Sequence, residues 1–276
     1  LRFGYNMRIY RPGIWYLNPY LNDSNPTNIS QGNSHLDSEK SHSFNLSYSN
    51  FTQKFNINLS ARYSFTNNSI EQVTEQVKDT EIEGLQNPTG KEVLYSTYQN
   101  IGKSRNASLS GYVNWNATSN TRIYANLYGN YTYMEGANGL KNDGWNLFAY
   151  GGAQQSLPHD WRISLNIYGQ TPWIMLQGKG SSFFDYGLSV NKSFLNKRLT
   201  LSAFASNFFK KYTSPTSSIE GVGFTQDSWN RYTRQRFGVS VSYRIGELKA
   251  SVKKAARTIS NDDVKGGGGE GGGGGE

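Results

Sequence analysis

The stretch Phe55–Phe65, FNINLSARYSF, alternates apolar and polar residues without interruption. Because successive side chains of a β-strand point to opposite faces, this order places every apolar side chain of the stretch on one face. The polar face carries Asn, Ser and Arg62, whereas the apolar face carries no charge. The stretch therefore predicts a β-strand whose two faces meet different surroundings.

The same alternation recurs in nine other segments of the chain. Most of the ten segments are about nine to eleven residues long, the length that a tilted strand needs to cross the hydrocarbon of a membrane. The nine segments are Leu1–Ile9, Phe44–Tyr48, Ala107–Trp115, Ile123–Tyr133, Leu147–Ala153, Trp161–Gly169, Phe184–Val190, Leu199–Ala205 and Phe237–Ile245. We therefore expect ten strands.

Charged residues avoid the apolar face of these segments and gather on the opposite face. A charge on the lipid-facing side of a membrane barrel costs about 2–4 kcal/mol at the midplane, whereas a charge in the lumen meets water. The arginines on the polar face are Arg2, Arg8, Arg62, Arg122, Arg162 and Arg244, together with Asp185. We expect these arginines to face a hydrated lumen.

The composition fits a membrane barrel better than a soluble domain. The 276 residues are 36% hydrophobic and 17% charged, and they include no cysteine, which excludes disulfides and thiolate metal sites. A soluble sandwich, propeller or lectin-like barrel would carry more Lys and Glu on its outer face. The sequence predicts an all-β fold, an antiparallel transmembrane β-barrel, with a soluble carbohydrate-binding β-protein as an alternative.

Short and long connections alternate between the predicted strands. Outer-membrane barrels have tight periplasmic turns and longer extracellular loops, so we expect the first strand to run outward from the periplasmic side. The short connections are Asn50–Lys54, Asn116–Asn120, Pro158–Asp160 and Leu195–Arg198. The long connections are Arg11–Ser41, Thr66–Arg105, Met134–Gly144, Thr171–Phe183 and Phe208–Arg236.

Aromatic residues in the long connections are the predicted ligand contacts. Aromatic rings stack on sugars and on flat ligands, and loops that face the medium are where capture takes place. These residues are Trp15, Tyr16, Tyr20, Trp173, Trp229 and Tyr232. The alternative is that they pack loop against loop or lie at the membrane boundary.

No motif for a metal, a cofactor or a catalytic reaction stands out. His35 and His42 flank Asp37 and Glu39, but the spacing matches no set of metal ligands. No Gly-x-Ser-x-Gly elbow accompanies the many serines. We expect neither a metal nor a cofactor, and no enzymatic activity.

The chain ends in a segment of different composition. We expect residues 1–246 to form the barrel strands and loops, and residues 247–276 to form a flexible, Gly-rich periplasmic tail, because glycine at that density cannot bury enough surface to fold. The tail is balanced in charge, so the net charge of +8 belongs to the barrel and its loops. Nothing favours a nucleic-acid partner. Basic residues near the last long connection are either solvated or attract anions such as lipopolysaccharide phosphates: Lys210, Lys211, Arg231, Arg234 and Arg236.

Four stretches give the chain a family resemblance. They are RIYRPGIWYLNPYLNDSNPTNISQGNSHLDSEKSHSFNLSYS at residues 8–49, YQNIGKS at 98–104, SFLNKRLTLSAFASNFF at 193–209, and VSVSYRIG with the following KKAARTISNDDVKGGGG. They resemble the C-terminal barrel half of the outer-membrane β-barrel family of TonB-dependent-receptor-like proteins of Gram-negative bacteria. The family pattern R-x-x-RP…LNP…GN…L…E is met by Arg8, Arg11, Pro12, Leu17, Asn18, Pro19, Gly32, Asn33, Leu36 and Glu39. Ser34 departs from it, because a proline often follows the Gly-Asn pair.

The resemblance implies a larger parent chain. Its barrel would have about 22 strands around a lumen filled by an upstream plug domain. A closed ten-stranded barrel is the alternative. The resemblance implies an outer-membrane location in contact with lipid and lipopolysaccharide. It also implies nutrient uptake driven by TonB-type energy coupling, with a surface lipoprotein as a candidate partner. A non-transporting outer-membrane scaffold or interaction barrel is the alternative.

Overall fold

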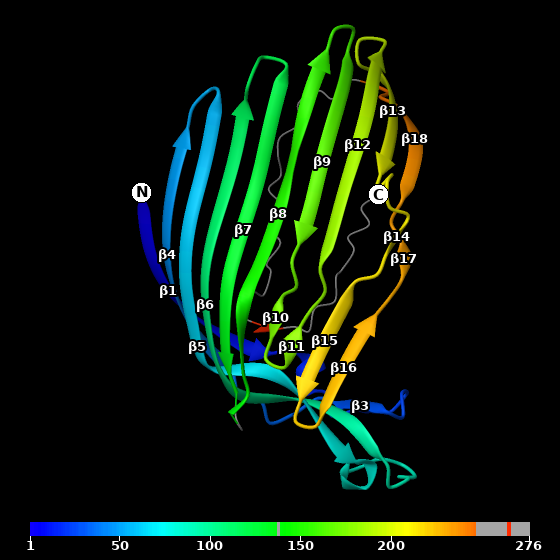
Figure 1. Ribbon diagram of the computed structural model, residues 1–276. Helices are drawn as coiled ribbons and strands as arrows, with labels where there is room; N and C mark the ends of the chain where they lie inside the picture. Colours follow the sequence, from blue (N-terminus) through cyan, green and yellow to red (C-terminus); the bar gives the residue numbers. More distant parts are fainter. Residues whose placement is uncertain (137–138, 247–263, 266–276) are drawn as a thin grey trace.

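A wall of ten antiparallel strands makes up most of the protein (Figure 1). The structure is a computed structural model that describes residues 1–136, 139–246 and 264–265. Each wall strand is hydrogen-bonded to the next one along the chain. The strands are β1 (Arg2–Pro12), β4 (Glu39–Phe51), β5 (Phe55–Lys78), β6 (Glu92–Asn116), β7 (Thr121–Glu135), β8 (Lys141–Leu157), β9 (Trp161–Gln170), β12 (Phe183–Phe194), β13 (Leu199–Ser206) and β18 (Arg236–Tyr243). The predicted all-β antiparallel fold is confirmed.

Within the described residues the wall is open. Its edge strands are β1 and β18, which lie at opposite sides of the curved sheet and do not pair with each other (Figure 1). Strand β1 pairs with β4 and, over two residues near its end, with the short β19 (Val264–Lys265). The described residues therefore form part of a barrel wall rather than a closed ten-stranded barrel.

The register of the wall keeps the predicted apolar positions on one face. One row across five strands consists of Tyr48, Leu59, Gly111, Leu127 and Ala149, each opposite the next. The larger side chains of this row stay uncovered by protein, and Leu127 is 58% exposed. Such a face is stable in a membrane, where lipid tails cover it.

The hydrophobic core of the protein lies outside the wall. The buried hydrophobic side chains of the described residues are Ile29, Ile70, Val73, Ile82, Val93, Ile174 and Leu176. All of them belong to the extensions and connections at the end of the wall opposite the tight turns, here called the loop end. The wall itself is stabilised by the hydrogen bonds between its strands, and by lipid on its apolar face and water on its polar face.

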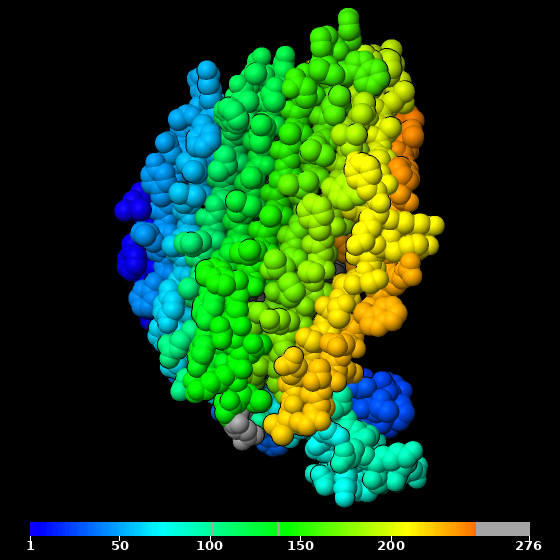
Figure 2. Space-filling view, viewed as in Figure 1, coloured from blue at the N-terminus to red at the C-terminus, as the bar shows by residue number. Residues whose placement is uncertain are grey.

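The longest predicted connection is largely a pair of strands. Strands β5 and β6 are 24 and 25 residues long, and they stay paired from Phe55 and Trp115 to Lys78 and Glu92. The prediction of a connection from Thr66 to Arg105 was wrong, because residues rich in Val, Thr and Tyr continue both strands after a bulge near Ser69. Figure 2 shows this extension, residues 70–100, projecting as a separate lobe beyond the wall; we call it the distal hairpin.

The connection predicted from Met134 to Gly144 is also shorter than expected. Strand β7 continues to Glu135 and β8 begins at Lys141. The carboxylate of Glu135 lies 3.8 Å from the ammonium of Lys103 and 3.6 Å from that of Lys141. The charges of Lys103 and Lys141 lower the pKa of Glu135, so an ion-paired cluster ends this strand pair.

A single carboxylate organises the tip of the distal hairpin, at the 3₁₀ turn η1 (Asp79–Glu81). Asp79 accepts hydrogen bonds from the backbone N–H of Thr89 at 2.6 Å, its hydroxyl at 2.7 Å and the N–H of Gly90 at 2.7 Å. Burial alone would raise the pKa of Asp79, but these hydrogen bonds lower it below its ordinary value of 3.8. The tip is therefore stabilised by the ionised form of Asp79.

The first long connection folds against the distal hairpin. It contains α1 (Ile14–Leu17), β2 (Leu21–Asn22) and β3 (Asn28–Gln31), and β3 pairs in parallel with β6. The N–H of Gly32 donates to the carbonyl of Asn18, and a Cβ at Gly32 would lie 2.3 Å from that oxygen. The carboxylate of Glu39 accepts from the N–H of Ile70 at the bulge of β5. These residues of the family pattern thus have structural roles.

The last two long connections form small sheets at the loop end. One sheet has the order β10 (Ile174–Met175), β11 (Gly178–Lys179), β15 (Thr216–Gly221) and β16 (Phe224–Trp229); the other pairs β14 (Tyr212–Thr213) with β17 (Tyr232–Thr233). The Gln177 amide bonds both the N–H (2.7 Å) and the carbonyl (2.8 Å) of Thr74. Gln226 donates to Asn28 at 3.1 Å. The first contact ties these connections to the distal hairpin, and the second ties them to β3 of the first connection.

The tight turns all lie at the other end of the wall, as predicted. The connections between β4 and β5, β6 and β7, β8 and β9, and β12 and β13 are each a few residues long. Leu195, Asn196 and Lys197 take positive φ angles in the last of them, a compact reversal. In the described part of the chain, no helix has the length and apolar character needed to cross a membrane.

Candidate functional site

The six predicted ligand-contact aromatics do not meet at one site. Three of them are strongly exposed: Trp15 and Tyr20 on the first long connection, and Trp229 on the last. Tyr16 packs edge-on against Tyr98, with 4.5 Å between ring centroids, and burial raises its pKa, helped by Tyr98 and nearby carboxylates. Their role as ligand contacts stays a prediction.

The other two predicted aromatics lie close to the wall. The indole of Trp173 covers Gly180, where an added Cβ would lie 2.0 Å from the ring, and this contact closes the β10–β11 hairpin. Tyr232 lines a cavity at the loop end of the polar face. Of these two residues, Tyr232 thus belongs to a candidate site.

The predicted lumenal arginines lie opposite polar residues of neighbouring strands. The pairs are Arg2–Ser47, Arg8–Ser41, Arg62–Asn45, Arg122–Gln154 and Arg162–Asn191. Arg122 also donates to Asn114. Arg244 follows β18, and its N–H bonds the carbonyl of Arg198. The register thus groups the first five arginines with the polar face, while their place in a lumen stays a prediction.

His42 has an aromatic environment. Its ring stacks on Phe65 at 4.9 Å and its Nδ1 lies 2.8 Å from the hydroxyl of Tyr5. Because His42 and Glu39 are three residues apart on one strand, their side chains point to opposite faces. In residues 1–136, 139–246 and 264–265 no three His, Asp or Glu side chains are grouped as metal ligands.

The cavity that contains Tyr232 is built on four wall strands. Its volume is about 460 Å³. Asp185 lies opposite Tyr168, and Gly187 lies opposite both Asn166 and Ser206 in the next row. Because Gly187 has no side chain, the middle of the floor is open. The lining residues are Asn166, Ile167, Tyr168, Asp185, Tyr186, Gly187, Ser206, Asn207, Tyr232, Thr233, Arg234 and Arg236.

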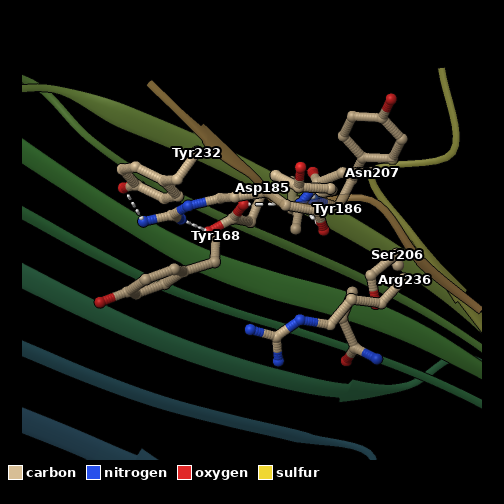
Figure 3. Close-up of a pocket in the computed structure, with 12 residues that line it drawn as sticks. Tyr168, Asp185, Tyr186, Ser206, Asn207, Tyr232 and Arg236 are labelled. Carbon is tan, nitrogen blue, oxygen red and sulfur yellow. Dashed lines mark hydrogen bonds and ion pairs between the residues drawn. The ribbon is translucent and has the colours of Figure 1, made fainter. Parts of the chain in front are cut away.

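A hydrogen-bonded network fixes one side of this cavity (Figure 3). The guanidinium of Arg234 forms an ion pair with Asp185 and donates to the hydroxyl of Tyr232 at 2.8 Å. The side chain of Asn207 donates to Asp185 at 2.7 Å and accepts from the N–H of Tyr186 at 3.2 Å. Burial alone would lower the pKa of Arg234, but Tyr232 and Asp185 together raise it.

The opposite side of the cavity has a free cation. Arg236 lies opposite Ser206, and Figure 3 shows its side chain and that of Tyr168 extending into the space beside Asp185. Among the described residues, no carboxylate forms an ion pair with Arg236. The cavity therefore offers one satisfied ion pair, one unpaired guanidinium, and the amide and hydroxyl groups of Asn166 and Ser206.

Sequence reasoning found parts of this site but could not assemble it. Asp185 was placed on the polar face, and Arg234 and Arg236 were recognised only as charge near a connection. Asn207 was missed, although it is 94% buried and has a φ of +49°. An Asn directly after an alternating segment is the available signal, because Asn tolerates the left-handed conformation that ends β13.

Comparisons with known proteins place the wall among outer-membrane proteins. A family model described as "Outer membrane protein beta-barrel family" matches residues 1–243. No curated protein matches the chain. Among solved structures, the copper transporter OprC matches with a TM-score of 0.58 and 15% identity, over 87% of this chain and 37% of that chain. At this identity the likeness concerns the fold, and the chain spans little more than a third of that structure.

Proposed function

Because the chain belongs to the outer membrane protein β-barrel family, we propose that it forms part of a TonB-dependent-receptor-like barrel that takes up a nutrient across the outer membrane. The chain lies in the cell outer membrane, which its strands cross.

The open polar face is the observation that carries this proposal. A closed barrel of about eight strands fills its interior with side chains, whereas barrels of about 22 strands have a wide lumen that is plugged. Here the polar-face rings of Tyr150 and Tyr168 are 41% and 37% exposed. Apart from the two-residue pairing of β1 with β19, the outer edges of β1 and β18 have no strand partner among the described residues, and hydrocarbon does not tolerate unpaired backbone groups. In the same parent chain, further strands would pair with the edges of β1 and β18, and a plug would cover the polar face.

The end of the wall supports a periplasmic exit of the chain. Strand β18 ends at Tyr243 beside the tight turn of Arg198, at the end of the wall that we propose faces the periplasm. Residues 247–263 and 266–276, most of the predicted tail, lie outside the described residues. A tail that follows this strand would begin in the periplasm.

Growth of a deletion strain tests the proposal. We expect a strain without the full-length gene to lose growth on at least one of a panel of single nutrients, and loss of the energy-coupling protein to reproduce that defect. Re-expression of the wild-type gene is the control. Equal growth of the deletion and wild-type strains on every nutrient would contradict uptake.

The distal hairpin favours a second candidate function, recruitment of another envelope protein. It projects beyond the wall, and its residues Ile82 and Val93 share a small buried core with Ile29 of β3. A surface lipoprotein is the expected kind of partner. We expect crosslinkers placed on the distal hairpin of the cell-surface protein to capture a lipoprotein. If no lipoprotein is captured although the deletion strain has a growth defect, uptake without a lipoprotein partner is favoured.

The copper in the name of the transporter OprC gives no information about the cargo of this chain, because at 15% identity the likeness does not extend to the side chains that would select a cargo.

A further inference from the structure

Aromatic rings form a continuous track on the polar face of the wall. The ring centroids of Tyr124 and Tyr150 are 5.7 Å apart, those of Tyr150 and Tyr168 are 6.3 Å apart, and those of Tyr168 and Phe183 are 4.8 Å apart. Phe148 adds an edge-on contact to Tyr168 at 5.2 Å. The track therefore crosses four strands, from β7 to β12, and ends at the cavity.

The register and one glycine produce this alignment. Tyr150 lies directly opposite Tyr168, and Tyr124 lies opposite Gly152. An added Cβ at Gly152 would lie 2.7 Å from the hydroxyl of Tyr124, so the absence of a side chain lets the Tyr124 ring lie over β8. The hydroxyl of Tyr124 donates to Asn166, which also lines the cavity.

Cations lie at the end of the track that reaches the cavity. The guanidinium of Arg234 is 5.3 Å from the centroid of Phe183 and is already paired with Asp185. Arg236, in contrast, enters the same cavity as Tyr168 without an ion-pair partner among the described residues. An anionic group at this position would meet an unpaired guanidinium, which binds carboxylates and sulfates through paired hydrogen bonds.

Exposed rings on a water-facing surface call for an explanation beyond folding. Apart from further rings such as Tyr112 and Tyr128, the polar face carries mainly Asn, Ser, Thr and Arg, which water solvates without loss. Burying the faces of Tyr150 and Tyr168 under a ligand would recover the free energy that their exposure costs. Asn166 and Ser206 stand beside the rings and offer hydrogen bonds to a ligand with a hydroxylated rim.

We propose that the track and the cavity bind an acidic saccharide. An apolar face of a sugar ring lies on Tyr150 and Tyr168, its hydroxyls bond Asn166 and Ser206, and its carboxylate or sulfate binds Arg236. The inference rests on the proposed uptake function and names the chemical class of the cargo. A flat aromatic acid would use the rings and Arg236 but not the amide and hydroxyl groups.

Binding by the purified full-length protein in lipid nanodiscs tests the assignment. The probes are an array of uronate-containing, sulfated and sialylated oligosaccharides with their neutral counterparts, and hits such as trigalacturonate are then titrated by calorimetry. We expect at least one acidic probe to bind more tightly than its neutral counterpart. Binding of no acidic probe, or equal binding of the neutral counterparts, would overturn the proposal.

Matched variants locate the binding site. We expect Arg236→Gln and Tyr168→Ala each to weaken binding of the acidic probe about tenfold or more, which corresponds to about 1.4 kcal/mol. Arg162→Gln and Tyr112→Ala are the controls, because they remove the same side-chain types from the polar face at a distance from the cavity. If the control variants weaken binding as much as the test variants do, the saccharide does not bind at this cavity.

Conservative variants guard against misfolding. Heat-modifiable migration in SDS gels shows whether each variant forms a barrel, and Arg236→Lys and Tyr168→Phe replace any variant that fails. We expect Tyr168→Phe to keep most of the affinity, because the ring stays, and Arg236→Lys to lose part of it. A growth defect without acidic-saccharide binding would overturn this inference alone, whereas binding without any growth defect would overturn uptake.

Discussion

A charge moved between the two faces of β7 tests the assignment of the wall. Leu127 lies six residues beyond Thr121, where β7 leaves its tight turn. Six residues span about 20 Å along a strand, which is about 15 Å along the membrane normal at a tilt of about 40° and close to the middle of an apolar band about 25 Å tall. Leu127 is 58% exposed, so its side chain would contact lipid there.

We expect Leu127→Arg to destabilise the full-length protein by about 2–4 kcal/mol, the cost of an arginine on the lipid face at the midplane. This corresponds to roughly a 30- to 1,000-fold change in the folding equilibrium. Guanidinium titration of the protein in phospholipid vesicles, followed by tryptophan fluorescence and by gel migration, measures the change.

The neighbouring position provides the matched control. Asn126 is exposed on the opposite face, between Tyr112 and Tyr150, and Asn126→Arg adds the same charge at the same depth on the water-facing side. We expect a change of less than about 1 kcal/mol, as for an ordinary surface substitution. Equal destabilisation by the two variants would refute the two-faced wall, and so would a larger loss from Asn126→Arg.

Three further predictions concern the loop end, and hydrogen exchange measures each. Gly32→Ala would place a Cβ 2.3 Å from the Asn18 carbonyl and should loosen the first connection by about 1–3 kcal/mol, whereas Gly4→Ala, which meets nothing within 4 Å, should change little; equal effects would contradict the close approach. Gln177→Ala leaves buried backbone groups of β5 without partners and should destabilise the distal hairpin by about 1–3 kcal/mol. Unchanged hydrogen exchange of β5 in this variant would contradict the prediction. The lowered pKa of Asp79 stabilises the hairpin tip above the unfolded value of 3.8, and that stability is lost as pH falls through the folded pKa. Asp79→Asn should remove this pH dependence. Amide protection of the wild-type tip that is the same in acid as at neutral pH would contradict the prediction.

Much of the wall could be predicted because a period of two is a local property. The alternation from Phe55 to Phe65 fixes which side chains share a face, and the same signal found all ten wall strands. The alternation also predicted the tight turns, because short polar runs such as Leu195–Arg198 interrupt the pattern. The resemblance carried by Gly32, Asn33 and Glu39 predicted the family.

The limits of the strands escaped prediction where the alternation weakens. Beyond Thr66 the polar and apolar residues no longer divide cleanly, because both faces of β5 are partly buried there: the neighbours Val73 and Thr74 are both buried although their side chains point to opposite faces. The signal of a half-buried strand then disappears although the strand continues. Hydrogen bonds between β5 and β6, not side-chain pattern, decide where these strands end.

The candidate site required the tertiary structure. Tyr124, Tyr150 and Tyr168 are separated by 18 residues or more, and nothing in their spacing shows that they meet. Register makes them neighbours, and Gly152 gives the ring of Tyr124 room. The predicted loop aromatics, in contrast, are spread over three connections and do not meet at one site.

The sequence by itself determined that this chain has one face for lipid and one for water, because alternation and the placement of charge depend only on neighbours along a strand. Only the tertiary structure decided which water-facing residues form a site, because strand register brings distant residues together. Register joins the aromatic track to Arg236 and leaves that guanidinium without a carboxylate in the described residues. Alternation defines the faces, and register defines the place where a ligand would bind.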